Sequence, residues 1–438
     1  MDHPVMFTIP GLVATARRLF QLALLGAVVG VACWPFNLLD HWQDLLLRRL
    51  PAFSGAAWDL PSLILCGLPV LTMPLLLLWQ ASSCRAGAGS GIPETMLCLE
   101  DPSLAGRFQA TAATLQRLLL WAVATISLMP MGREGPVVQM GAAVAHGLRQ
   151  RFPSWLRDMS SADLLAVGSG AGLAAGFNTP LMATVFVAEE LTGGFQMTLI
   201  WPLLVCCAVA AGVSNLAGQP MFALGLLSQS SPEIRQLTKA MVIGVVAGLL
   251  GALFGRLMLA TRMWLKDRVR RQPLVTGLML GLALMVLMLL SGGAAGGDGE
   301  TLMSDMIARL DQEADLPQLL RLLFCRMVGP CLVLGVGVPG GLIDPAFTIG
   351  AVFGHAFGSL GSLQGLGMAI GMTAALAGAT QLPVVSVLFA LRLAGDQQLL
   401  PGMLLAAVIG AYMSRLLIGQ PFYHVLTEQL RQSTPPPE

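Results

Sequence analysis

The chain has 438 residues, of which 55% are hydrophobic and only 11% are charged, and its net charge at neutral pH is +1. Soluble domains carry about 25% charged residues, so this composition excludes an ordinary soluble protein and indicates an integral membrane protein. The near-zero net charge gives no reason to expect a nucleic-acid partner. We therefore expect a multi-pass protein of the cell (inner) membrane, surrounded by the lipid bilayer.

A helix needs about 20 apolar residues to cross the bilayer core, and several runs of the sequence meet or approach that length. They are 19–35, 60–80, 112–130, 197–217, 239–260 and 274–291. Arg17 and Arg18 precede the first run, as in a signal peptide. No convincing small-residue cleavage site follows, so we expect a retained first helix.

The eight cysteines lie mostly inside apolar runs and lack C-x-x-C spacing. This distribution is typical of small side chains that pack against neighbours or lipid. We expect no metal site and no disulfide.

Loop charge predicts the orientation of the chain. The segment Arg262–Arg271 is basic and reads as a loop, whereas the segment 298–315 carries six acidic residues. Basic loops stay in the cytoplasm, so the first segment is expected inside. The run 274–291 separates the two segments, which places the acidic one outside.

Two further apolar runs, 137–148 and 345–358, are too short to span the membrane. The first has only 12 residues, which is roughly 18 Å of helix against a hydrocarbon core of about 30 Å. Each follows a turn rich in glycine and proline. The pattern predicts half-helices that begin inside the membrane.

The two short runs and the segments after them also resemble each other. At an offset of 209 the matching pairs are Pro136 and Pro345, Gly141 and Gly350, Ala142 and Ala351, and His146 and His355; at an offset of 203 they are Gly168 and Gly371, Ala171 and Ala374, Leu173 and Leu376, Ala174 and Ala377, Pro180 and Pro383, and Phe186 and Phe389. We therefore expect one transmembrane domain, 1–438, with repeat halves at about 18–225 and 235–425 and a short tail, 426–438. Repeated halves with interrupted helices are typical of transporters with a site near the membrane midplane.

Three glycine-rich turns open the proposed half-helices: GSGIPE at 89–94, GREGP at 132–136 and GGLIDP at 340–345. The start of a helix carries unpaired N–H groups and a partial positive charge, so it attracts anions. Irregular backbone at this depth is tolerated only where it is buried or lines a cavity. The substrate is therefore expected to be an anion.

These motifs, together with FNTP at 177–180 before Glu189 and Glu190 and QPFY at 420–423, stand in an order and spacing that resemble the CLC family of chloride channels and chloride/proton antiporters. The resemblance covers nearly the whole chain from about residue 18. It implies an all-α fold of two inverted-topology repeats with many tilted and broken helices. It also implies a homodimer with one pore per subunit and, since 15 residues follow Tyr423, no C-terminal regulatory domain.

The resemblance also implies roles for individual residues. The anion-binding residues are the Ser90 and Tyr423 hydroxyls and the backbone N–H groups of Leu342 and Ile343, with Arg133 and Gly135 in the adjoining turn. Glu134 resembles the gating glutamate, whose carboxylate occupies an anion site and leaves it when protonated. Glu190 resembles the inner proton-transfer glutamate of the antiporters. Bound chloride ions are expected, and no cofactor.

Three of these positions leave alternatives open. Arg133 is either an anion ligand or, as we favour, a structural residue that fixes its turn. Glu189 is either a second functional acid or a solvated helix end. Asp344 stands where the family has a small apolar residue, and it is either a second titratable gate or a helix cap next to Pro345. We favour the cap.

The leading interpretation is proton-coupled chloride antiport. The alternatives are a passive chloride channel of the same fold, against which Glu190 argues, and a fluoride exporter, against which Ser90 argues. An intramembrane enzyme is a third alternative, but the sequence has no H-E-x-x-H and no recognisable serine hydrolase motif. We therefore expect a transporter and no enzyme.

Overall fold

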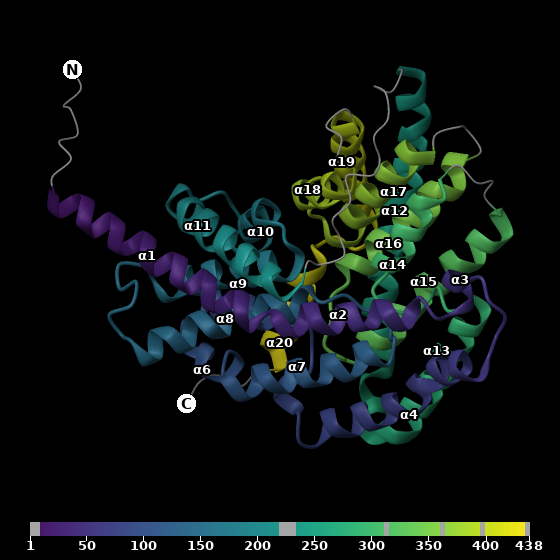
Figure 1. Ribbon diagram of the computed structural model, residues 1–438, viewed down its shortest axis with the longest axis horizontal. Helices are drawn as coiled ribbons and strands as arrows, with labels where there is room; N and C mark the ends of the chain where they lie inside the picture. The colour runs from purple at the N-terminus through teal and green to yellow at the C-terminus, as the bar shows by residue number, and fades with distance from the viewer. Residues whose placement is uncertain (1–8, 219–233, 311–314, 360–363, 395–398, 434–438) are drawn as a thin grey trace.

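The computed structural model describes residues 9–218, 234–310, 315–359, 364–394 and 399–433. All the regular elements in this part of the chain are helices (Figure 1). In the first half they are α1 (Ile9–Ala32), α2 (Trp34–Leu47), α3 (Pro51–Ser54), α4 (Leu60–Ala81), α5 (Ile92–Glu100), α6 (Ala105–Phe108), α7 (Thr111–Ile126), α8 (Glu134–Arg151), α9 (Ser161–Phe177), α10 (Pro180–Phe186) and α11 (Met197–Ser214). In the second half they are α12 (Ile234–Arg271), α13 (Pro273–Leu290), α14 (Glu300–Ala308), α15 (Leu316–Leu334), α16 (Ile343–Ser359), α17 (Gln364–Thr380), α18 (Pro383–Ala394), α19 (Leu400–Leu417) and α20 (Phe422–Ser433).

Seven helical stretches of the described residues are long and apolar enough to cross a membrane: Val13–Leu47, Leu60–Ala81, Met197–Ala217, Met241–Arg271, Pro273–Leu290, Leu316–Leu334 and Leu400–Ser433. Five of them overlap predicted runs, namely 19–35, 60–80, 197–217, 239–260 and 274–291. The run 112–130 corresponds to α7, an apolar helix of 16 residues that is shorter than these stretches. Two spans were missed because prolines and arginines, such as Arg326 and Arg415, interrupt their apolar sequence.

The two proposed half-helices are longer than predicted. α8 has 18 residues and α16 has 17 residues. The apolar run understated α8 because Arg149 and Arg151 continue it, and basic side chains are favourable in the last turn of a helix. Both helices nevertheless begin in the protein interior, since Glu134 and Ile343 are buried.

The basic segment Arg262–Arg271 is not a loop. It forms the last turns of α12, with Arg268, Arg270 and Arg271 at the helix end. The acidic segment contains α14, and its residues 311–314 lie outside the described part of the chain. The same holds for 219–225 at the end of the first repeat half and for 434–438 of the predicted tail. The repeat limits and the orientation stay predictions.

Gly132 and Gly341 are matched by the offset of 209, and they pair with each other. The Gly132 N–H donates to the Gly341 carbonyl at 3.0 Å, and the Gly341 N–H donates to the Gly132 carbonyl at 3.1 Å. Equivalent residues that contact each other reciprocally lie on a two-fold axis. A pseudo-two-fold axis therefore passes between these glycines, next to Glu134.

Unusual backbone conformations also occur at matched positions. At the offset of 209, Leu128 has φ 58° and Gly337 has φ 82°. At the offset of 203, Asn178 has φ 51° and Gln381 has φ 64°. Positive φ is uncommon for side chains other than glycine, so its recurrence indicates that both halves fold in the same way.

Close helix packing repeats as well. A Cβ atom added to Gly141 of α8 would collide with the Gly168 carbonyl of α9, and one added to Gly350 of α16 would collide with the Gly371 carbonyl of α17. These are the glycines that the two sequence offsets relate. Only glycine lets two helix backbones approach this closely. The structure thus confirms the all-helical, two-repeat fold class.

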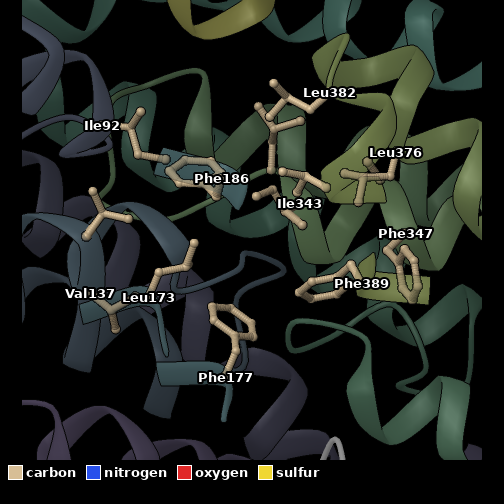
Figure 2. Close-up of a cluster of buried hydrophobic side chains, with 14 of the residues drawn as sticks. Ile92, Val137, Leu173, Phe177, Phe186, Ile343, Phe347, Leu376, Leu382 and Phe389 are labelled. Carbon is tan, nitrogen blue, oxygen red and sulfur yellow. The ribbon is translucent and has the colours of Figure 1, made fainter. Parts of the chain in front are cut away.

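Part of the apolar core lies between the two halves (Figure 2). Phe389 contacts Phe177 of the first half and Phe347 of the second, with ring centroids 5.6 and 5.0 Å apart. Figure 2 shows Ile343 in the middle of this cluster. The first turn of α16 is thereby fixed against both repeats.

Many large apolar side chains remain exposed on the long helices, among them Leu71 of α4, Met279 of α13 and Val408 of α19. A water-soluble surface rarely carries apolar side chains in such number. These helices present the surface that faces lipid. All eight cysteines are buried, as predicted from their apolar surroundings.

Candidate anion and proton site

The three glycine-rich turns meet backbone to backbone beside the pseudo-two-fold axis. The Gly89 N–H donates to the Gly337 carbonyl at 2.8 Å. A Cβ atom on Gly91, whose φ is 106°, would lie 2.6 Å from the Gly135 carbonyl. One on Gly135 would collide with Ser90. Gly135 therefore shapes the site through a close backbone approach.

A buried ion pair holds the first turn. Glu94 accepts the Gly91 N–H at 2.9 Å through one carboxylate oxygen. The Arg117 guanidinium donates to the other oxygen and to the Ala88 carbonyl, both at 2.9 Å. The sequence interpretation gave no role to Glu94 or Arg117, because their contact depends on tertiary structure.

The Glu134 carboxylate lies at the start of α16. Its Oε1 accepts the Asp344 N–H at 2.7 Å, and the side chain is fully buried. Its Oε2 has no hydrogen-bond partner among the described residues. Gly341 leaves room for this carboxylate, since a Cβ atom there would overlap it. A negative group therefore occupies a helix N-terminus, the kind of position that binds anions.

The Ser90 and Tyr423 hydroxyls border a cavity of about 30 Å³ together with Gly340 and Leu342. Both hydroxyl oxygens are buried and have no hydrogen-bond partner in the described part of the chain. Buried polar atoms nearly always have partners, so two such hydroxyls at one cavity point to a bound species. The cavity has room for about one water-sized particle, which suits a small anion.

The other two expected ligands are the backbone N–H groups of Leu342 and Ile343. Both side chains belong to the apolar core, and Leu342 also lines this cavity. Ile343 is the first residue of α16, so its backbone N–H belongs to the unpaired groups at the helix start.

Arg262 of α12 also lines the cavity, and the sequence interpretation counted it only as a loop charge. Its side chain is half-buried. No hydrogen bond or ion pair engages it within the described residues. Apolar side chains, such as Met258 and Leu426, make up much of the remaining wall. The guanidinium adds positive charge to the α12 side of the cavity, and this charge would stabilise an anion bound there.

The contacts of Arg133 argue against a role as anion ligand. Its guanidinium forms ion pairs with Asp40, with Glu300 at 2.8 Å and with Asp298 at 3.8 Å. Its Nε donates to the Gly176 carbonyl at 3.0 Å. Three carboxylates already neutralise this side chain, so the structural interpretation replaces that of an anion ligand. Arg133 ties α8 to α2, α9 and the region around α14.

The cap interpretation of Asp344 is wrong. α16 begins at Ile343, so Asp344 lies inside the first turn and Pro345 follows as the third residue. Both Asp344 carboxylate oxygens are buried and accept no hydrogen bond from the described residues. The helix starts two residues earlier than the Asp-Pro pattern suggested, so Asp344 does not occupy the cap position.

Glu190 lies in a π-helical turn, Val187–Leu191, and its side chain is 1% exposed. Its carboxylate lies 3.6 Å from Nδ1 of His424. His424 also lines a cavity of about 410 Å³, together with Glu100, Glu428 and Arg431. His424 follows Tyr423 in the chain, and no local sequence signal revealed this contact.

Glu189 is not a solvated helix end. Its carboxylate accepts the Val384 N–H at 3.1 Å and the Val385 N–H at 2.8 Å. These groups belong to the first turn of α18. Glu189 therefore caps a helix of the other repeat, and Glu190 alone points into the interior next to His424.

Known proteins resemble the chain over most of its length. The family model described as "Voltage gated chloride channel" matches residues 71–415. The "H(+)/Cl(-) exchange transporter ClcA" of Vibrio campbellii (strain ATCC BAA-1116) is 30% identical over 327 residues, which are 70% of this chain and 69% of the relative. The "Voltage-gated ClC-type chloride channel ClcB" of Escherichia coli O157:H7 (strain EC4115 / EHEC) is 32% identical over 344 residues, 74% of this chain and 78% of the relative.

A solved structure described as a slow cyanobacterial Cl⁻/H⁺ antiporter has the same fold. It superposes with a TM-score of 0.75 at 21% identity and covers 94% of this chain and 98% of its own. The two-repeat helical architecture is therefore shared with structures of this kind.

Proposed function

Because the chain belongs to the voltage-gated chloride channel family, we propose that it carries chloride across the membrane in exchange for protons. The observation that supports exchange is the pair of buried glutamates at the site. Glu134 contacts Asp344, which follows the proposed ligands Leu342 and Ile343. Glu190 contacts His424, which follows the proposed ligand Tyr423. Each of the two glutamates thus contacts a residue that is the next one along the chain from a proposed anion ligand.

The geometry suggests how the two ions are coupled. The ionised Glu134 carboxylate competes with chloride for the start of α16, since both are anions. Protonation removes the charge, and with it the attraction to the helix N-terminus. Chloride can then enter, and the proton travels with Glu134. Glu190 delivers or receives the proton on the side of the cavity lined by His424.

The relatives carry the names of both an exchanger and a channel, so their names do not decide between the two. Glu190 favours exchange, because a buried carboxylate next to a titratable histidine can take up and release protons, which a passive anion pore does not require. Ser90 favours chloride over fluoride. We propose bound chloride as the ligand, no cofactor and no enzymatic activity. We also propose a homodimer in the cell (inner) membrane.

Flux measurements on the purified protein in liposomes test the exchange. A chloride gradient should drive protons uphill, with both ions recorded in the same vesicles. Chloride flux without proton flux at every pH would assign the protein to the passive channels instead.

Glu190→Gln is expected to weaken proton flux strongly while chloride flux continues. The amide keeps the size of the side chain but cannot carry a proton between His424 and the site. Simultaneous recording of both fluxes measures this effect. Asp158→Asn, an exposed acid in a surface ion pair with Arg18, serves as the control and should behave like wild type. Proton flux at the wild-type level in Glu190→Gln would exclude Glu190 from the proton path.

Ser90→Ala and Tyr423→Phe are each expected to weaken chloride binding by about 1–3 kcal/mol, because each removes one donor from a buried anion. Isothermal titration calorimetry in detergent measures the affinity. Tyr412→Phe is a matched control, since Tyr412 is the other tyrosine of the chain and is 60% exposed on α19. Unchanged affinity in both site variants would move the anion site elsewhere.

A further inference from the structure

We propose that Asp344 is a second carboxyl group of the gate, which shares one proton with Glu134. This inference rests on the proposed exchange and adds to it a residue that sets the proton affinity of the gate. It starts from the failure of the cap interpretation, which leaves a fully buried acid without a hydrogen-bond partner among the described residues.

The two carboxyl groups border the same small space. A Cβ atom placed on Gly132 would lie 2.6 Å from Oε1 of Glu134 and 2.8 Å from Oδ2 of Asp344. The backbone of Asp344 also donates its N–H to Glu134 at 2.7 Å. Gly132 lies beside the pseudo-two-fold axis, so the acids of α8 and α16 lie at the contact between the repeats.

Arg133, which acts on this pair, pairs directly with other acids. Arg133 is committed to Asp40 and Glu300. The groups that act electrostatically on Asp344 are Glu134, Asp298, Glu300 and Arg133, with Arg392 of α18 and the Tyr423 phenol of α20. Acids outnumber cations in this set, so negative charge accumulates around the two carboxyl groups.

Two carboxylates that share a buried site do not both ionise, because each disfavours the charge on the other. An unpaired charge in a low-dielectric interior is also costly. One proton held between Glu134 and Asp344 relieves both penalties, and the protonated group can donate a hydrogen bond to its neighbour. The first proton to arrive binds more tightly than it would to Glu134 alone, because it relieves the repulsion between the two charges. When Glu134 holds this proton, its carboxyl group no longer competes with chloride for the start of α16. Asp344 thereby makes protonation of the gate easier.

Asp344→Asn tests the proposal in the full-length protein, because asparagine keeps the size and removes the charge. The pH at which chloride-driven proton flux is half-maximal should move down by about one unit or more, a tenfold loss of proton affinity. Calorimetry of chloride binding in two buffers with different heats of ionisation should show fewer protons taken up than in wild type. Asp305→Asn, a partly exposed acid paired with Arg309 on α14, is the matched control and should match wild type in both measurements.

Asp344→Glu keeps the carboxyl group and should retain proton uptake, which separates the role of the proton from that of packing. The proposal is overturned if Asp344→Asn has the wild-type pH midpoint and proton number. It is also overturned if neither variant binds chloride, because Asp344 would then serve folding. Wild-type protein without any proton flux would contradict the proposed exchange itself, whereas a change restricted to proton uptake would still support the shared proton.

Discussion

Glu134→Ala and Glu134→Gln are expected to abolish proton flux while chloride flux continues. In the structure the Glu134 carboxylate occupies the start of α16 and accepts the Asp344 N–H. Neither alanine nor glutamine carries a negative charge, so neither competes with chloride for the helix N-terminus, and neither binds a proton. The anion path stays open and the coupling disappears.

Liposomes that record chloride and proton flux together measure this loss, and proton flux should fall to the background of empty vesicles. Asp158→Asn again provides the control, because Asp158 is an exposed acid in an ion pair with Arg18. Robust uphill proton transport by Glu134→Ala would show that another group carries the proton.

The motifs predicted the positions of Ser90, Glu134 and Tyr423 because the turns that hold them depend on short local patterns. Gly91 has a φ of 106°, which side chains rarely adopt, and Gly135 leaves no room for a Cβ atom next to Ser90. Such requirements fix residue types at fixed spacings. The repeat was equally visible, since matched glycines form the same helix contacts in both halves.

Contacts between distant segments could not be predicted in this way. Arg133 and Glu300 are 167 positions apart, and nothing near either residue indicates the other. The role of Asp344 depended on whether α16 starts at residue 343 or 345, a difference that decides where the carboxylate points. Arg262 was taken for a loop residue because the apolar run ends before α12 does. Sequence patterns therefore predicted the glycine-rich turns, but they did not predict which distant residues contact those turns.

The largest effect on stability is expected for Arg133→Gln. Arg133 is 1% exposed and forms ion pairs with Asp40, Asp298 and Glu300, which lie within 4.8 Å of one another. Removing the guanidinium leaves three buried carboxylates facing each other without the cation that pairs with all three. Breaking a buried ion pair from one side costs about 3–5 kcal/mol, because the remaining charge is uncompensated.

Arg133→Gln should therefore unfold at a clearly lower temperature than wild type in detergent, as measured by intrinsic tryptophan fluorescence. Arg309→Gln is the matched control: it also breaks an arginine–aspartate pair on the side of α14, but its side chain is 47% exposed, so about 0–1 kcal/mol is expected. Arg133→Lys should fall between the two, since lysine keeps the charge but loses the forked donor geometry that reaches Glu300 and Asp40 together. An unfolding temperature of Arg133→Gln equal to that of Arg309→Gln would mean that the three acids are neutral in the folded protein, and that Arg133 does not hold the gate in place.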